Sequence, residues 1–260
     1  QSNPKPNKGQ TGAAVCYNKT VETPPRLLLF DGNAIVHRAY HAIKTGLSVR
    51  RTGEVVNAVF GFSQMLLKAV SDVQPTHLAL TFDLPGPTFR HDLDPEYKAH
   101  RPPMPEDLVS QLDRVREVVA AMNIQVYELS GYEADDMLGT LSAQAQAQGV
   151  ETVIVTSDGD MMQLVQPGVR VLYIKMSGGT SDALFYDDAA VIARYQVTPD
   201  QVRDLKGLKG DTSDNIKGVR GVGDKTAVKL IQQFGSIEDI YQHLDEITPA
   251  SLQEKLRAGV

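Results

Sequence analysis

Short apolar runs alternate with helical patterns from residue 26 onward, and this alternation constrains the fold more than any other feature of the chain. The apolar runs are RLLLFD (26–31), HLALTFD (77–83), IQVYEL (124–129) and ETVIVTSD (151–158). Each has the length and the unbroken apolar character of a strand buried on both faces. The helical patterns between them cover about 54–73, 106–122 and 134–148. We therefore predict an α/β fold, with a mostly parallel sheet and helices on both of its faces.

Three regions depart from this alternation. Residues 1–25 contain no Leu, Ile or Phe and end in two prolines, which predicts a disordered leader or extension, with a transit-peptide remnant as the alternative. Residues 84–105 are rich in proline and charge and form a long excursion from the sheet, a kind of loop that is usually functional or disordered. After about residue 187 we expect no further strands. The predicted domains are thus a core at 26–186 and a helical region at 187–260.

Composition restricts where such a chain works. No run of 18 apolar residues exists, so no membrane partner is expected. The single cysteine, Cys16, excludes an internal disulfide framework and a cysteine-based zinc site. These features predict a cytoplasmic protein, or an organellar one if the leader is a transit remnant.

Acidic residues follow the predicted strands. Asp31, Asp83 and Asp158 end three of the apolar runs, and the carboxyl ends of parallel strands line a common crevice. The stretch GYEADD (131–136) then places three acids at the start of a predicted helix. A single acid there would be explained by helix capping. Three acids can aim at one point only when they face outward past the helix N-terminus, an arrangement that suits a bound cation.

A further acidic pair, Asp211 and Asp214, lies in KGDTSDN, where turn formation or N-capping is the alternative role. The complete set of candidate ligands is Asp31, Asp83, Glu133, Asp135, Asp136, Asp158, Asp160, Asp211 and Asp214. Without cations, nine converging carboxylates would repel one another strongly. Ligands that are all oxygen select Mg²⁺ or Mn²⁺ over Zn²⁺, and two such ions about 4 Å apart promote in-line displacement at a phosphodiester.

The net charge of −6 does not oppose a nucleic-acid partner. Of the 32 acidic residues, nine belong to the candidate site, so 23 remain against 26 Lys and Arg. The rest of the chain therefore carries +3, and the position of charge matters more than its sum.

Six stretches carry a family resemblance when they are taken together and in order. They are LLLFDGNAIVHRAYHA (27–42), FDLPGPTFRH (82–91), EYKAHRPPMPEDL (96–108), GYEADDMLGTL (131–141), TSDGDMMQLV (156–165) and KGDTSDNIKGVRGVGDKTAVKLI (209–231). They resemble the 5′-nuclease (flap endonuclease-like) family, in particular the 5′→3′ exonuclease domains at the N-terminus of bacterial DNA polymerase I. The resemblance implies a PIN-like Rossmannoid sheet, a flexible helical arch at about 84–105, and a C-terminal helix-hairpin-helix (H3TH) element.

The resemblance also implies an activity and a ligand set. Members of this family cut branched or 5′-ended duplex DNA in replication and repair, and they remove primers or flaps by metal-activated water. The first ion would be held by Asp31, Asp83, Glu133, Asp135 and Asp136, and the second by Asp158, Asp160, Asp211 and Asp214. The implied state is a monomer, fused to or acting with a DNA polymerase. Two positions depart from the common pattern, Gly159 in place of a basic residue and His100 in place of Asn.

Basic and aromatic residues supply candidate DNA contacts. With the resemblance, Lys98 and Arg101 are expected to clamp the scissile phosphate, whereas composition alone would make them a solvated charged face. Arg38 and Arg90 have weaker claims to a phosphate. Tyr40 is expected either to stack on a base or to belong to the core. The neighbouring His37 and His41 are expected to be packing or surface residues.

The glycine-rich stretch GVRGVGDKTAVKLI (218–231) is the second candidate DNA contact. Its glycines would let backbone amides approach a phosphate at a helix N-terminus, with lysines adding charge. The residues concerned are Gly218, Gly221, Gly223, Lys225, Thr226 and Lys229. The resemblance implies a K⁺ ion in this hairpin, whereas a plain helix-to-helix turn is the structural alternative.

Other functions remain to be weighed against a nuclease. A catalytically weak homologue that binds branched DNA is the first alternative, although all nine acidic positions are filled. A phosphatase of the haloacid dehalogenase type would need Asp-x-Asp after the first strand, where this chain has Asp31 and Asn33. A PIN-type ribonuclease is closer in fold, but the hairpin and arch motifs favour DNA.

Overall fold

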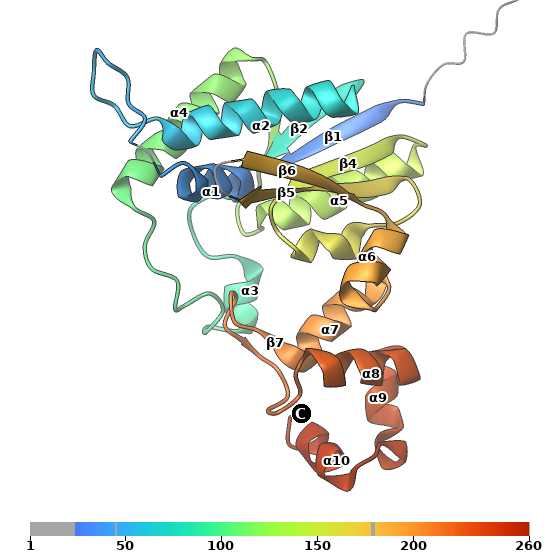
Figure 1. Cartoon of the computed structure of the whole chain (residues 1–260). Helices are drawn as coiled ribbons and strands as arrows, with labels where there is room; N and C mark the ends of the chain where they lie inside the picture. Colours follow the sequence, from blue (N-terminus) through green and yellow to red (C-terminus); the bar gives the residue numbers. More distant parts are fainter. Residues whose placement is uncertain (1–23, 45, 178–179, 260) are drawn as a thin grey trace, which may run out of the picture.

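The computed structural model describes residues 24–44, 46–177 and 180–259, and Figure 1 shows their arrangement. The leader predicted at 1–25 lies outside these residues except for its last two, so its disorder stays a prediction. Within the described part of the chain, no helix is both long and apolar enough to cross a membrane.

A six-stranded sheet with the order β3-β2-β1-β4-β5-β6 forms the centre of the molecule (Figure 1). Its strands are β1 (Arg26–Asp31), β2 (His77–Thr81), β3 (Gln125–Tyr127), β4 (Glu151–Thr156), β5 (Val169–Ser177) and β6 (Thr180–Tyr186). The first five are parallel, and β6 runs antiparallel to β5. The mostly parallel sheet and the four predicted strands are confirmed, although β2, β3 and β4 each end two residues earlier than predicted.

Helices cover both faces of this sheet. One face carries α1 (Gly32–Ala42), α2 (Asn57–Val73) and α4 (Glu106–Ala121), and the other carries α5 (Ala134–Ala147). The three helical patterns are confirmed within three residues at each end. The sequence pattern had not indicated α1, which starts directly after β1 because Asp31, the last residue of that strand, caps it through the Ala34 N–H.

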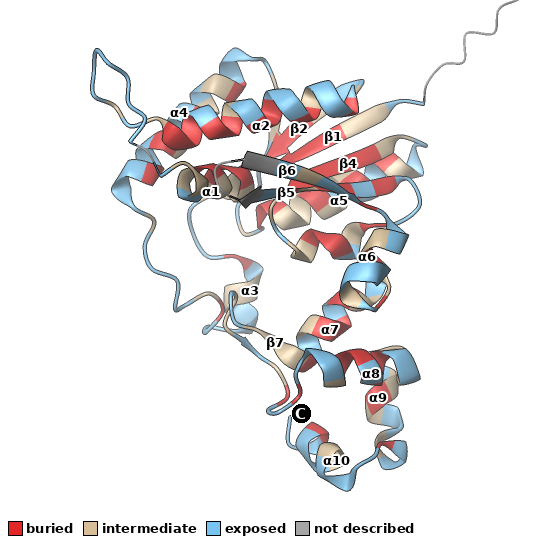
Figure 2. Cartoon of the chain, in the orientation of Figure 1, coloured by how far each residue is buried: buried red, intermediate tan, exposed pale blue. Residues whose placement is uncertain are grey.

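The strand β1 shows why its apolar run is unbroken. Leu28 and Phe30 pack into the core under α1, α2 and α4, whereas Leu29 packs on the opposite face with Leu138 of α5 and Ile154 of β4. All three β1 side chains are fully buried, and each such burial stabilises the fold by about 1.5–3 kcal/mol. Figure 2 shows the buried residues concentrated along the central strands.

The chain after β6 is mainly helical and shares the core on the α5 face of the sheet. Its helices are α6 (Asp188–Tyr195), α7 (Val202–Lys209), α8 (Asp224–Phe234), α9 (Ile237–Gln242) and α10 (Ala250–Arg257), with short 3₁₀ turns at Pro199–Gln201 and Leu244–Glu246. The expectation of no strands beyond 187 is wrong for two pairs of residues, β7 (Gly210–Asp211) and β8 (Ile216–Lys217). A Cβ on Gly218 would lie 2.1 Å from the Gly210 nitrogen, so this pairing requires glycine.

The proline-rich excursion at 84–105 reaches from the sheet to the turn between β7 and β8 (Figure 1). It holds one helix of five residues, α3 (Phe89–Leu93), and is otherwise turn and coil, so the implied helical arch is helical only there. The Lys98 N–H donates to the Asp214 carbonyl over 2.9 Å, and the Asn215 side-chain amide donates to the Glu96 carbonyl over 2.7 Å. These bonds fix the excursion beside the carboxyl edge of the sheet.

Candidate metal centre and nucleic-acid interface

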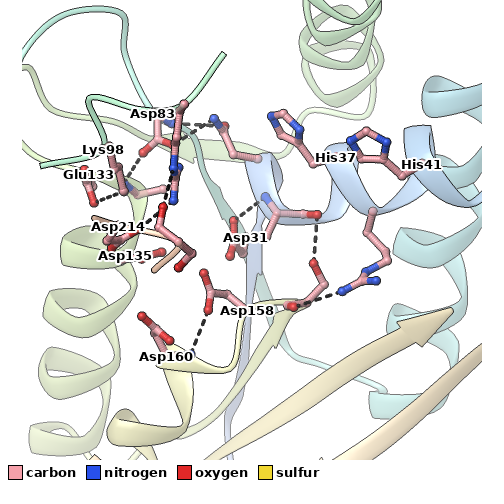
Figure 3. A pocket seen from close by; sticks show the side chains of 17 residues that line it. Asp31, His37, His41, Asp83, Lys98, Glu133, Asp135, Asp158, Asp160 and Asp214 are labelled. Carbon is pink, nitrogen blue, oxygen red and sulfur yellow. Dashed lines mark hydrogen bonds and ion pairs between the residues drawn. The ribbon is translucent and has the colours of Figure 1, made fainter. Parts of the chain in front are cut away.

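A cleft of about 540 Å³ lies at the carboxyl edge of the sheet (Figure 3). Seven predicted ligands line it, namely Asp31, Asp83, Glu133, Asp135, Asp158, Asp160 and Asp214. In Figure 3 the acidic side chains gather on one side, and His37 and His41 lie along α1 on the other. The ends of separate strands and the start of α5 therefore do converge, as the parallel topology requires.

Asp31 is a buried carboxylate that is held through both of its oxygens. One oxygen accepts from the Ala34 N–H over 2.9 Å and the other accepts from the Thr156 hydroxyl over 2.7 Å. The residue is 2% exposed. Burial raises the pKa of Asp31 to about 6, with Asp158 and Asp83 adding repulsion, although both hydrogen bonds oppose the rise. A nearby cation would offset this cost of ionisation.

Asp83 links the second strand to the start of α5. Its carboxylate accepts from the Asn33 side-chain amide over 2.9 Å and from the Ala134 N–H over 2.7 Å. The second bond caps an otherwise free amide at the helix N-terminus, where the helix dipole also favours negative charge. Asn33 was not among the predicted site residues, although it follows a strand-end aspartate by two positions.

Asp135 carries the strongest sign that a cation belongs in the cleft. Burial raises the pKa of its carboxyl well above the ordinary value, and repulsion from Asp31, Asp158 and Asp83 raises it further. Among the described residues, no lysine or arginine lies within 4.0 Å of the carboxylates of Asp31, Asp83, Asp135 or Asp158. Gathered, unpaired oxygen ligands fit a hard divalent ion.

Glu133 receives two donors from the excursion. The Lys98 ammonium lies 2.9 Å from its Oε2, and the Tyr97 hydroxyl donates to the same oxygen over 3.0 Å. Tyr97 also lies 3.3 Å from Asp214 and is 5% exposed. Sequence reasoning missed Tyr97, although it stands directly before Lys98. This tyrosine therefore connects Glu133, at the start of α5, with Asp214, between β7 and β8.

A second acidic group consists of Asp160, Asp211 and Asp214, whose oxygens lie within 4.8 Å of one another. Asp160 opens the 3₁₀ helix Asp160–Leu164, and the other two come from the β7–β8 turn. The Lys206 ammonium contacts Asp160 and lies 2.6 Å from Asp211. Burial raises the pKa of Asp160 to about 6 despite this lysine. For Asp211, burial is outweighed by Lys206 and Ser213, which lower its pKa to about 2.

Asp136 does not line the cleft, so the expectation that all three acids of GYEADD aim at one point fails for this residue. Both of its oxygens accept from the Arg90 guanidinium over 2.8 Å. One of them also accepts from the Glu133 N–H over 2.9 Å. Asp136 therefore anchors the start of α5 to the excursion, and its role as a metal ligand remains a prediction that the geometry does not favour.

Three basic residues expected to bind phosphate reach the cleft, namely Arg38, Lys98 and Arg101. Arg101 pairs with Asp214 over 2.7 Å, and Arg38 donates to the Ser157 carbonyl over 3.4 Å. Lys98 has a left-handed backbone, which a non-glycine residue adopts only when its surroundings hold it. His37 and His41, which were expected to be packing or surface residues, also line the cleft. Burial lowers the pKa of His37, so the ring faces the cleft uncharged near neutral pH.

Two other predicted DNA contacts lie away from the cleft lining. The Tyr40 hydroxyl donates to Asp107 of α4 over 3.0 Å, and its ring packs against the core beneath α1 and α2, which favours the structural alternative. Arg90 is engaged by Asp136 and stacks over the Phe89 ring. DNA contacts by these residues stay predictions.

The glycine-rich turn before α8 divides into two parts. Gly218 is required by the close approach to Gly210 and is therefore structural. Gly221 has a φ of +81°, and Gly223 stands at the N-cap of α8 with open space around it. Lys225 and Lys229 are exposed on the same helix, with Thr226 partly buried between them. An accessible helix N-terminus with two exposed lysines fits a phosphate contact.

The departure at Gly159 has a local explanation. A Cβ at this position would lie 2.8 Å from the Tyr195 hydroxyl of α6. A larger residue would therefore require that tyrosine to move. His100, the second departure, is exposed and is not among the described residues that line the cleft.

Comparison with known families covers almost the whole described chain. A model described as "5′-3′ exonuclease, N-terminal resolvase-like domain" matches residues 26–196. A second, described as "5′-3′ exonuclease, C-terminal SAM fold", matches residues 197–260. The first match contains the acids at the strand ends, and the second contains the β7–β8 turn. Both parts of the cleft lining therefore lie within the matched residues.

Similar proteins are much longer than this chain. DNA polymerase I of Chloroflexus aurantiacus is 46% identical over 235 residues, covering 90% of this chain and 25% of that protein. DNA polymerase I of Bacillus caldotenax is 44% identical over 232 residues, covering 89% and 26%. The chain thus spans about a quarter of the length of these relatives.

Solved structures share the fold at low identity. The T5 D15 protein co-crystallised with metal ions aligns with a TM-score of 0.74 at 20% identity, covering 90% of this chain and 84% of that one. The catalytic core of Rad2 in complex with DNA substrate aligns with a TM-score of 0.58 at 16% identity, covering 91% and 72%.

Proposed function

Because the chain belongs to the 5′-3′ exonuclease family, we propose that it is a structure-specific 5′ nuclease, which hydrolyses DNA phosphodiesters near 5′ ends and at 5′ flaps. The observation that carries this proposal is the gathering of seven carboxylates in one cleft with Lys98 and Arg101 at its side. The acids supply ligands for hard cations, and the two basic residues supply donors for a phosphate.

Divalent ions, Mg²⁺ or Mn²⁺, fit the oxygen-only donor set. One ion would be held by Asp31, Asp83, Glu133 and Asp135, and another by Asp158, Asp160, Asp211 and Asp214. When bound, such ions activate water and neutralise charge on a phosphodiester. The proposal also includes a K⁺ ion at the turn before α8, which the family resemblance implies.

The protein's own groups hold and orient the substrate. Lys98 and Arg101 reach the cleft from the excursion, and each is paired with a carboxylate, Glu133 or Asp214. A phosphate in the cleft would compete for these donors and place the scissile bond beside the acids. Arg38, on α1, also lines the cleft and would hold a neighbouring phosphate. The exposed N-terminus of α8 would hold the duplex backbone farther away.

The biological setting extends the proposal. The similar polymerases carry the matched region as about a quarter of their length, so we place this nuclease beside or fused to a DNA polymerase, in primer or flap removal. A cytoplasmic location near bacterial DNA belongs to the same proposal, as does action as a monomer.

A cleavage assay on a 5′-flap duplex tests the function. The labelled duplex is incubated with protein and Mg²⁺, with EDTA and an Asp158→Asn variant as controls. We expect cuts near the junction that leave 5′-phosphate and 3′-hydroxyl ends, and none with either control. Tight binding without cleavage at any metal concentration would instead support a catalytically weak DNA-binding homologue.

A further inference from the structure

Lys206 lies among the second group of acids although no sequence pattern indicated a role for it. Its ammonium contacts Asp160 and lies 2.6 Å from Asp211. Those two residues belong to the same group as Asp214, in which each residue has a carboxylate oxygen within 4.8 Å of the others. The ammonium therefore touches two of the four carboxylates that are proposed to hold the second ion.

The position of Lys206 is fixed by the core. It stands in the last full turn of α7, whose buried residues Val202, Leu205 and Leu208 pack into the core on the α5 face of the sheet. The lysine side chain is 27% exposed and that of Asp211 is 11% exposed. The ammonium is therefore an ion-paired cation inside the site, held by Asp160 and Asp211.

We propose that Lys206 is a built-in competitor of the second divalent ion, which holds Asp160 and Asp211 together until an ion displaces its ammonium. The inference rests on the proposed function only in taking Asp160, Asp211 and Asp214 as ligands of that ion. It assigns to Lys206 the control of metal affinity at one site, and no part in the chemistry.

The competition follows from charge and hydrogen bonding. A carboxylate oxygen that accepts from an ammonium must lose that bond, or share it, before it binds a metal ion. The ammonium and the ion would also repel each other at close range. Among the described residues, a basic side chain pairs with one of the four acids proposed for the first ion, Glu133, but with three of the four proposed for the second, Asp160, Asp211 and Asp214. The two ions should therefore bind with unequal affinity, and the one near Lys206 should be the weaker.

Manganese titration of the protein without DNA tests this proposal independently of catalysis. Free Mn²⁺ is measured by electron paramagnetic resonance for the wild type and for Lys206→Met. Hydrogen bonds to charged groups are strong enough that we expect the weaker dissociation constant to fall about tenfold or more in the variant. The tighter constant should stay unchanged. In EDTA, the variant should unfold at a lower temperature than the wild type, and Mn²⁺ should restore more of its stability.

A matched control lies three residues away. Lys209, also on α7, pairs with the exposed Asp224 over 2.6 Å and does not line the cleft. Lys209→Met should leave both Mn²⁺ affinities unchanged. Lys206→Gln retains hydrogen-bond donors without the charge and should tighten the same site, which keeps the test decisive if Lys206→Met does not fold.

The possible outcomes separate this inference from the proposed function. If the wild type binds two ions and the second site is unchanged or weaker in both Lys206 variants, the proposed competition by Lys206 is wrong. The proposed nuclease function would not be affected by that result. A wild-type protein that binds no Mn²⁺ would overturn the metal-dependent function itself. A lower dissociation constant for the weaker Mn²⁺ site in the Lys206 variants, but not in Lys209→Met, supports the inference.

Discussion

The Arg90 guanidinium holds the Asp136 carboxylate through two parallel hydrogen bonds of 2.8 Å. The adjacent Asp135 points instead into the cleft, beside Asp31 and Asp158. Two neighbouring acids at the start of α5 therefore have different tasks. Asp135 contributes charge for a cation, and Asp136 fastens the helix to the proline-rich excursion.

Neutralising each acid in turn should separate these tasks. Asp135→Asn should abolish cleavage and weaken Mn²⁺ binding while DNA binding in Ca²⁺ or EDTA stays near wild type. Asp136→Asn should keep Mn²⁺ binding and lower the free energy of unfolding by about 1–3 kcal/mol, because Arg90 loses its charged hydrogen-bond partner. Flap cleavage, Mn²⁺ titration and urea unfolding measure the three quantities. Equal loss of metal binding in both variants would return Asp136 to the ligand set.

The same ion pair predicts a pH dependence of stability. Burial acts to raise the pKa of Asp136, but the hydrogen bonds from Arg90 and from the Glu133 amide outweigh it and lower the pKa below the ordinary 3.8. A carboxylate with a lowered pKa in the folded state contributes stability above the unfolded value and loses it as pH falls through the folded value. The difference in free energy of unfolding between wild type and Asp136→Asn should therefore have its full size at about pH 6 and be smaller at about pH 3. Urea unfolding at both pH values measures it, and Arg90→Gln should show the same trend.

Much of the fold was predictable because the sheet is buried on both faces. Leu28, Leu29 and Phe30 in β1 are all fully buried, so their run carries a strong and unambiguous signal. The edge strand β6 gives a weaker sequence signal, because Leu184 and Phe185 remain exposed. The pair β7–β8 was missed because its four residues depend on one close contact between glycines rather than on an apolar pattern.

The site was predictable only as far as topology determines it. Acids at the ends of parallel strands must share one edge, so the convergence of Asp31, Asp83 and Asp158 follows from the strand order. The pairing of Asp136 depends instead on Arg90, 46 residues earlier in the chain. Lys206 reaches the acids because α7 packs on the core. Such contacts between distant segments leave no local pattern in a sequence.

Removing the Tyr97 hydroxyl should disturb both acidic groups. This hydroxyl lies 3.0 Å from Glu133 and 3.3 Å from Asp214. Burial and the two carboxylates raise the pKa of Tyr97, so it remains a neutral donor. Tyr97→Phe should lower kcat about tenfold or more with little change in KM, because the acids lose a bond that orients them. Tyr241→Phe, which removes a hydroxyl bonded to the Leu256 carbonyl, is the control and should keep wild-type turnover.

Lys98→Ala should slow the chemical step rather than binding. Loss of one donor to developing charge on a phosphate costs about 10²–10³ in kcat. Single-turnover cleavage of a 5′-flap duplex measures the step directly, and Lys68→Ala, which breaks a surface pair with Asp72, should cleave normally. A defect seen only in DNA affinity would make Lys98 a positioning contact instead.

Changing Lys225 and Lys229 together to alanine should weaken the dependence of DNA affinity on salt. Both lysines are exposed on α8, Lys225 in its first turn and Lys229 about one turn later. Each neutralised phosphate contributes about 0.9 to the slope of log affinity against log salt. If both lysines bind phosphates, the slope should fall by about 1.8 in the double variant, measured with duplex DNA in Ca²⁺ across a salt series. Cleavage at saturating DNA should persist, because neither lysine lines the cleft. An unaltered slope, equal to that of Lys68→Ala, would remove this helix from the DNA contact.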